Sequence, residues 1–338
     1  MKKIITTLSL SLLTTLSVLA QERPTFRAYE YDSQSPIASM SDNGKWAVAS
    51  SNRESVATTR LINLETNEVT MLSSSAATEY AADVTDDGMI LVGNVAGHPA
   101  IYSALFESWM PLETKSPYVN GNAVSVTPDG RYAVGVLYYG DGYYSIPALW
   151  ELTEEGGTLV QDIYTMGGLP TKDMAHKDQQ MMDFRAISAD GRYILGCMSF
   201  SYLPTSLDNG GCFYFVYDRE KASYKPIGFT ETETGRWTPK SEGLIVIMEA
   251  AMSNNGRYVT GNAHTEGDGD EYELPFLYDV ERDKFVAYNE VLAQNTYGSA
   301  VTNDGVVLSA SPVSTPVREW SVRLGKYWFS FDEILKQK

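Results

Sequence analysis

Apolar runs alternate with a polar turn whose pattern occurs six times along the chain. In the third copy one apolar run ends at Val126, the turn 127–131 follows, and a second run begins at Tyr132. In every copy Asn or Asp directly precedes a glycine, and Ser or Thr lies three residues before it. The six glycines are Gly44, Gly88, Gly130, Gly191, Gly256 and Gly305. An Asx-Gly pair between two apolar runs is a strong β-hairpin signal, so the pattern predicts six hairpins.

Each conserved feature of the repeat has a physical reason. Glycine adopts a positive φ without steric cost, and the Ser or Thr hydroxyl hydrogen-bonds to the backbone of its own turn. The second residue after the glycine is a bulky β-former. The fifth residue after it is always Gly or Ala, which predicts close approach of a neighbouring backbone. The residues at this fifth position are Ala49, Gly93, Gly135, Gly196, Gly261 and Ala310.

The spacing of the turn glycines predicts an all-β fold, a six-bladed β-propeller of four-stranded antiparallel blades. A blade of four strands needs roughly 40 to 50 residues, and three of the five spacings fall in that range. The other two leave room for inserted loops. The last blade is expected to place its third and fourth strands at 319–323 and 327–330. A β-sandwich with similar turns is the alternative, but a sandwich requires no periodic motif.

Residues 1–20 have the pattern of a secretory signal peptide. Lys2 and Lys3 precede the apolar stretch Ile4–Leu19, and Ala20 suits cleavage before Gln21. An uncleaved membrane anchor is the alternative, although the stretch is short for a typical span. Residues 21–338 are then a single propeller domain, secreted or periplasmic. No later stretch is apolar enough to cross a bilayer, so no membrane insertion is expected after cleavage.

Charge and cysteine content narrow the function classes further. The formal net charge is −17, which argues against a nucleic-acid partner because phosphate backbones attract basic surfaces. The cysteines Cys197 and Cys212 fall on strands expected to be antiparallel neighbours in the fourth blade. An exported chain permits a disulfide between them, and two buried thiols are the alternative.

The third repeat carries a resemblance to a known family. Its stretch Ala123–Gly130, followed by Gly135 and then Ala148–Trp150, resembles the HAF-type repeat of secreted bacterial proteins. It is more loosely similar to the Asp-Gly propeller repeats of TolB-like proteins. The resemblance covers nearly all of 21–338 and implies an exported β-propeller with a binding or scaffolding role, without catalytic residues. The chain departs from the pattern in its two long insertions and in its third strands, where Trp150 is replaced in other copies by Phe106, Tyr217 and Tyr278.

Candidate ligand-binding residues gather in loops predicted at one face of the propeller. A tyrosine-rich loop between the second and third strands of the third blade offers flat rings with polar tips, which suit a glycan or a protein partner. The alternative is that half of these rings pack into the blades. Trp237, in the insertion 232–241, is a further exposed aromatic candidate. The loop candidates are Tyr138, Tyr139, Asp141, Tyr143 and Tyr144.

Metal binding has only weak support. His98, His176 and His264 fall on the same predicted face, but no pair has a ligand spacing. We therefore predict no metal, and keep His98 and His264 as ligand-contacting candidates. Asp268 and Asp270 lie in a Gly-rich acidic loop that resembles the start of a calcium loop without its later ligands. Calcium there is an open alternative to a solvated turn, and no cofactor is otherwise expected.

Enzyme signatures are absent from the sequence. There is no His-Glu-x-x-His, no phosphate-binding Gly-Lys-Ser/Thr loop and no Gly-x-Ser-x-Gly. The sequence therefore predicts an exported, non-catalytic binding or interaction propeller. One alternative is an extracellular carbohydrate-active hydrolase or lyase that uses loop carboxylates. The other is a structural component of an envelope complex, which would show a broad apolar surface.

Overall fold

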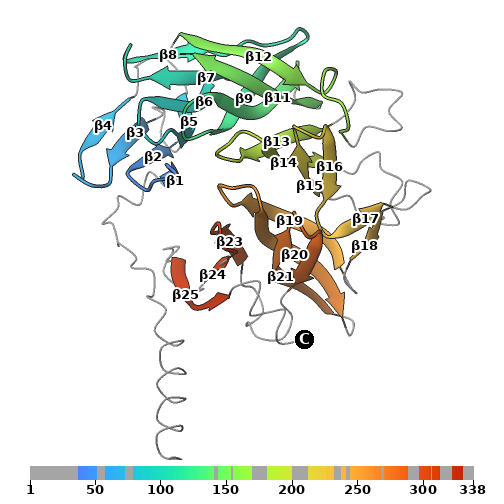
Figure 1. Cartoon of the computed structure of the whole chain (residues 1–338). Coiled ribbons are helices and arrows are strands. Elements are labelled where there is room, and N and C mark those ends of the chain that lie inside the picture. The colour runs from blue at the N-terminus through green and yellow to red at the C-terminus, as the bar shows by residue number, and fades with distance from the viewer. Residues whose placement is uncertain are drawn as a thin grey trace, which may run out of the picture. The chain divides into compact units, whose positions relative to one another are not determined.

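A computed structural model describes most of the chain from residue 37 onward (Figure 1). The predicted signal peptide at 1–20 lies outside the described residues. No helix in the described part of the chain is long and apolar enough to cross a membrane. The structure describes residues 37–51, 58–72, 79–140, 144–153, 155–169, 181–199, 212–231, 237–240, 244–267, 270–287, 297–305, 307–312 and 322–329.

Every regular element of the described residues is a β-strand, and the strands form successive antiparallel sheets (Figure 1). Within each four-stranded sheet the strands are neighbours in chain order, which is the arrangement of a propeller blade. The first sheet contains β1 (Ile37–Met40), β2 (Trp46–Ser51), β3 (Thr58–Asn63) and β4 (Val69–Met71). The second contains β5 (Glu79–Val84), β6 (Ile90–Val95), β7 (His98–Ser103) and β8 (Ser108–Pro111). The third contains β9 (Tyr118–Val126), β10 (Tyr132–Tyr139), β11 (Ser145–Thr153) and β12 (Gly156–Asp162).

Three further blades and one hairpin follow. The fourth sheet contains β13 (Met182–Ile187), β14 (Tyr193–Ser199), β15 (Cys212–Asp218) and β16 (Ser223–Pro226). The hairpin pairs β17 (Phe229–Glu231) with β18 (Trp237–Pro239). The fifth sheet contains β19 (Leu244–Met252), β20 (Tyr258–Gly267), β21 (Asp270–Asp279) and β22 (Lys284–Ala287). The last contains β23 (Tyr297–Val301), β24 (Val307–Pro312) and β25 (Val322–Phe329).

The prediction of four-stranded antiparallel blades is confirmed for the first five sheets. In the last sheet the expected strands at 319–323 and 327–330 are replaced, within the described residues, by the single strand β25. Its residues from Val322 to Phe329 pair with β24, opposite Pro312 at one end and Val307 at the other. No described strand of this sheet pairs with β1–β4, so a closed ring of six blades stays a prediction.

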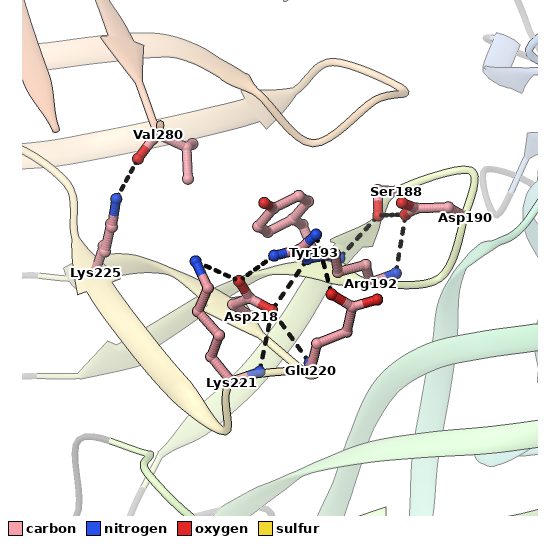
Figure 2. A network of polar contacts seen from close by, with 9 residues as sticks. All are labelled: Ser188, Asp190, Arg192, Tyr193, Asp218, Glu220, Lys221, Lys225 and Val280. Atoms are coloured by element: carbon pink, nitrogen blue, oxygen red, sulfur yellow. Dashed lines mark hydrogen bonds and ion pairs between the residues drawn. The ribbon is translucent and has the colours of Figure 1, made fainter. Parts of the chain in front are cut away.

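The six predicted turns are present, and their side chains bond as the motif requires. In the third blade Gly130 N–H donates to the Thr127 carbonyl at 2.8 Å, and Gly130 has a φ of 70°. The Thr127 hydroxyl donates to Asp129 Oδ1 at 2.6 Å and accepts from Tyr132 N–H at 3.0 Å. The fourth blade repeats this pattern with Ser188 and Asp190 (Figure 2). The turn is therefore closed by residues within five positions of one another.

In the first five blades the bulky residue two positions after the turn glycine packs against the turn of the next blade. A Cβ built on Gly256 would lie 2.5 Å from the Tyr193 ring, and one on Gly88 would lie 2.5 Å from the Trp46 ring. The same relation joins Gly130 to Ile90, Gly191 to Tyr132 and Gly305 to Tyr258. A Cβ built on Gly44 would meet no described atom within 4 Å. The glycine thus serves both the backbone conformation and the stacking of one blade on the next.

The small residue five positions after the turn glycine marks close backbone approach, as predicted. A Cβ on Gly93 would meet the Tyr80 carbonyl oxygen at 1.8 Å, and one on Gly261 the Glu249 carbonyl oxygen at 1.8 Å. At Gly196 the neighbour is instead the Phe215 ring. In each of the six sheets that carry a turn motif the first strand has an irregular register in this region, typical of a β-bulge that bends the strand.

The buried face of the third strands holds the largest core side chains. Trp150, Tyr217 and Tyr278 are fully buried at equivalent positions of their blades. In the second blade the register gives this position to Tyr102, opposite Leu91. The assignment of Phe106 to it was wrong, because β7 ends at Ser103 and Phe106 lies exposed in the following turn.

The turn edge of the fourth blade is held by an ion-pair network (Figure 2). Arg192 donates to both oxygens of Asp218, at 3.1 Å from Nε and 2.9 Å from Nη2, and also lies 3.0 Å from Glu220. Burial raises the pKa of Asp218, but the Arg192 hydrogen bonds and charge outweigh it, so the pKa lies below its ordinary value. Lys225 donates to the Val280 carbonyl and so links this blade to the next.

Candidate functional site

A row of four tyrosines lies at the loop edge of the third blade, opposite its Asx-Gly turn. Tyr139 ends β10, Tyr118 begins β9, and the two residues are paired across the strands. The Tyr139 ring meets the Tyr118 ring edge-on, with centroids 5.7 Å apart, and the Tyr144 ring with centroids 6.3 Å apart. The Tyr118 hydroxyl lies 3.4 Å from that of Tyr164, which follows β12. We call Tyr118, Tyr139, Tyr144 and Tyr164 the tyrosine row.

The row combines a buried anchor with exposed rings. Tyr118 is fully buried, whereas Tyr139 is 41% exposed and Tyr164 is 42% exposed. Lys115 places its ammonium 4.5 Å from the centre of the Tyr164 ring and bonds to the buried carboxylate of Asp162 at 2.6 Å. A ring held on one side by packing loses little conformational entropy when a ligand covers its other side, so Tyr139 and Tyr164 suit recognition.

His98 belongs to the same edge of the sheets. It begins β7 and is exposed, and its Nδ1 lies 2.9 Å from the Val119 carbonyl oxygen of β9. The two loops are also joined by the Gly121 N–H, which donates to the Gly97 carbonyl at 2.9 Å. His98 is thus oriented by the blade that carries the tyrosine row, with its second ring nitrogen left for solvent or a ligand.

Tyr138 points to the other face of the third sheet, because successive strand residues alternate. Its hydroxyl lies 3.4 Å from the Asn122 amide nitrogen. Burial raises the pKa of Tyr138, and the negative charge of Asp183 on β13 raises it further. The phenol therefore stays protonated and can donate a hydrogen bond. The strand alternation divides Tyr138 from Tyr139, which the sequence grouped together.

Asp183 and Arg185 form a bidentate ion pair on β13. Arg185 Nε donates to Asp183 Oδ1 at 2.9 Å, and Nη2 lies 2.8 Å from Oδ2. Burial raises the pKa of Asp183 even though the Arg185 charge opposes it. Arg185 is the additional residue of the bulge between Phe184 and Ala186, and bulges redirect side chains. The pair presents a donor and an acceptor together, a combination that suits hydroxyl groups.

Of the remaining sequence-predicted residues, those that the structure describes lie on other sheets. Asp141 and Tyr143 lie outside the described residues, as do His176 and Asp268. Trp237 lies on β18, opposite Glu231. His264 lies on β20, opposite Glu273, and Asp270 begins β21. In the described part of the chain no three His, Cys, Asp or Glu side chains are grouped as a metal site.

The cysteines lie on adjacent strands of the fourth blade, as expected. Cys197 is opposite Tyr214 on β15, and Cys212 is opposite Ser199 on β14. They are therefore diagonal neighbours in the strand pairing, and the disulfide between them stays a prediction.

Sequence reasoning missed Tyr118, Tyr164, Asn122, Asp183 and Arg185. The first two flank strands far from the tyrosine-rich loop in sequence, so only the sheet pairing brings them to it. A signal for Arg185 did exist. At the equivalent position, six residues before the turn glycine, the other repeats have Ala38, Ala82, Val124, Ala250 and Ser299. A charged residue among small and apolar ones is a departure that alignment of the repeats would have found.

Comparisons with known proteins give distant likenesses of fold. No family model and no curated protein matches the sequence. Among solved structures the chain is similar to hydrazine synthase from Kuenenia stuttgartiensis, at 13% identity and a TM-score of 0.48, over 85% of this chain and 80% of that one. It is similar to TolB from Acinetobacter baumannii, at 12% identity and a TM-score of 0.42, over 75% of this chain and 56% of that one. An oligogalacturonate lyase in complex with manganese matches at 11% identity and a TM-score of 0.42, over 81% and 84%. These likenesses are of fold only, and they assign no function to this chain.

Proposed function

We propose that this chain is an exported, non-catalytic binding module that takes a glycan ligand at the loop edge of its third blade. The observation that carries the proposal is the tyrosine row. It presents two exposed rings, Tyr139 and Tyr164, on a fully buried tyrosine. Ring faces of this kind cover the apolar face of a sugar, and the phenol hydroxyls remain available to water or to the ligand.

The polar groups on the other face of the third sheet extend this chemistry. Asn122, Tyr138 and the Asp183–Arg185 pair supply donors and acceptors without an excess of either charge. A neutral polyhydroxyl ligand satisfies both kinds of group, whereas an anion or a cation satisfies only one. We place the sugar rings against the tyrosine row, with hydroxyls of an extended glycan reaching the ion pair.

Export and ring closure belong to the same proposal. The basic and apolar pattern of residues 1–20 supports cleavage of a signal peptide and a secreted or periplasmic location. Six turn motifs support six blades, with the last sheet next to the first. A protein partner at the same rings is the alternative ligand.

The test compares two exposed-aromatic variants of the full chain after export. Tyr139→Ala with Tyr164→Ala should weaken binding to a responsive polysaccharide about 5- to 150-fold, since each ring contributes about 0.5–1.5 kcal/mol. Phe106→Ala is the matched control, because Phe106 is an exposed aromatic residue (49%) at the opposite edge of a blade. Isothermal titration with a panel of neutral and acidic polysaccharides measures both. Equal affinity of the double variant and the control would refute the tyrosine row as the site.

A further inference from the structure

The turn edges of the blades are built on a repeated ion pair. A cation directly after the turn glycine faces an acidic residue at the end of the third strand or in the turn that follows it. The pairs are Lys45 with Glu65 at 3.6 Å, Arg131 with Glu151 at 3.6 Å, Arg192 with Asp218 at 2.9 Å, and Arg257 with Asp279 at 3.4 Å. The turn edges of the first, third, fourth and fifth blades therefore have the same kind of ion pair.

The second blade replaces the ion pair with apolar side chains. Met89 takes the position of the cation, and Leu105 and Phe106 form the turn between β7 and β8. The two turns are in contact, because the Ala104 N–H donates to the Met89 carbonyl at 2.8 Å. The side chains are 41%, 56% and 49% exposed. We call Met89, Leu105 and Phe106 the apolar turn patch.

Three carboxylates lie on the same two turns as the patch, and a fourth lies on the turn of the first blade that is hydrogen-bonded to Asp86. They are Asp42, Asp86, Asp87 and Glu107, and none of them forms an ion pair with another described residue. Asp86 Oδ1 accepts the Asn43 N–H at 2.8 Å, and Asp87 Oδ1 accepts the Met89 N–H at 2.9 Å. The two turns of the second blade, 85–89 and 104–107, carry Asp86, Asp87 and Glu107 and contain no Lys or Arg, whereas four other blades have a cation at the position of Met89.

The charges of this region already act on one another. Partial burial, followed by the negative charges of Asp83 and Asp86, raises the pKa of Asp42 to about 6. A positive group placed near Asp42 and Asp86 would relieve that repulsion. The apolar turn patch therefore has an apolar centre and an acidic rim, and a ligand that carries positive charge would complement that rim.

We propose that the apolar turn patch docks a basic, amphipathic peptide segment of a partner protein. Apolar side chains of the segment cover Met89, Leu105 and Phe106, while its Lys or Arg side chains lie against Asp86, Asp87 and Glu107. A second copy of this chain fits less well, because its net charge of −17 and its own acidic rim repel the first. The proposal is independent of the glycan site, which lies at the opposite edge of the sheets.

The probes are three synthetic peptides of equal length added to the full exported chain. One alternates Leu with Lys, one alternates Leu with Glu, and one alternates Ser with Lys. Methyl NMR of Met89 and isothermal titration should detect binding of the Leu-Lys peptide alone, with an affinity that falls as salt rises. Binding of the Leu-Glu peptide with equal affinity would overturn the charge argument, and equal binding of the Ser-Lys peptide would overturn the apolar one.

Variants locate the binding on the chain. Met89→Arg with Leu105→Glu restores the ion pair of the other blades and should weaken the Leu-Lys peptide at least tenfold, and Glu107→Gln should weaken it less. Val69→Ser with Met71→Ser, two exposed apolar residues of β4, is the control and should leave binding unchanged. Equal loss in the control would refute the assignment. Self-association of the wild-type chain in sedimentation, abolished by the patch variant, would also overturn it in favour of a second copy.

Discussion

Replacement of Gly256 by alanine tests how one blade is held against the next. Gly256 has a φ of 70°, and an added Cβ would lie 2.5 Å from Tyr193 Cδ2 and 2.6 Å from Tyr193 Cβ. The second atom is close to the backbone of Tyr193, so rotation of the ring cannot remove the overlap. The alanine therefore suffers both a left-handed backbone and a collision with the fourth blade.

The magnitude follows from these two contributions. An L-residue in the left-handed region costs roughly 1–2 kcal/mol, and overpacking in a filled site costs about 1–3 kcal/mol. Gly256→Ala should thus lower the free energy of unfolding by about 2–5 kcal/mol. Gly44→Ala is the matched control, because Gly44 has the same φ but an added Cβ there would meet no described atom within 4 Å. It should cost only the backbone contribution, about 1–2 kcal/mol.

Urea unfolding followed by tryptophan fluorescence measures both variants in the same full-length chain. A double-mutant cycle with Tyr193→Gly, which removes both the ring and its Cβ, isolates the contact, since Gly256→Ala in that background should cost no more than Gly44→Ala. Equal losses for Gly256→Ala and Gly44→Ala in the wild-type background would refute the packing of Tyr193 on the turn. The glycine would then be required for its backbone conformation alone.

Two further predictions concern the charged turn edge. Asp42→Asn should be more stable than wild type at pH 7. Because the pKa of Asp42 is raised to about 6 in the folded protein, the contribution of its protonation to folding stability is fully present below about pH 4 and is lost as the pH rises through about 6. Thermal melts should show a higher midpoint for Asp42→Asn at pH 7 and not at pH 4, and an equal advantage at both would contradict the assignment. Arg192→Met should lower the urea midpoint of unfolding more than Arg131→Met. Arg192 binds the buried carboxylate of Asp218, whereas Arg131 and Glu151 are both exposed and Arg131 Nε lies 3.6 Å from Glu151 Oε1. Because the pKa of Asp218 is lowered in the folded protein, the ion pair stabilises the fold fully at pH values above the pKa of Asp218 in the unfolded chain. This stabilisation is lost as the pH falls through the pKa of Asp218 in the folded protein. A difference between the two Arg variants that persists fully at pH 2 would argue for packing in place of charge.

The sequence alone determined the local features of this fold, which are the turns and the small residue that follows each turn. Each turn is specified by a Ser or Thr, an Asx and a glycine within a few positions, and those residues satisfy one another's hydrogen bonds without help from the rest of the chain. The small residue after each turn could likewise be inferred, because a missing side chain in a strand signals a close neighbour. The turns and the four-stranded blades that follow from them were predictable for this reason.

Tertiary structure decided what lies between blades and which side chains share a surface. Tyr193 and Gly256 are far apart in sequence, and nothing local relates them. Tyr138 and Tyr139 are adjacent in sequence but lie on opposite faces, where one joins Asn122 and the other joins Tyr118. β7 ends at Ser103, so Phe106, which the repeat had placed in the third strand, lies exposed in the following turn. Backbone conformation in a turn depends on neighbours in sequence, whereas a binding surface depends on register and strand ends, which are set by packing across the whole sheet.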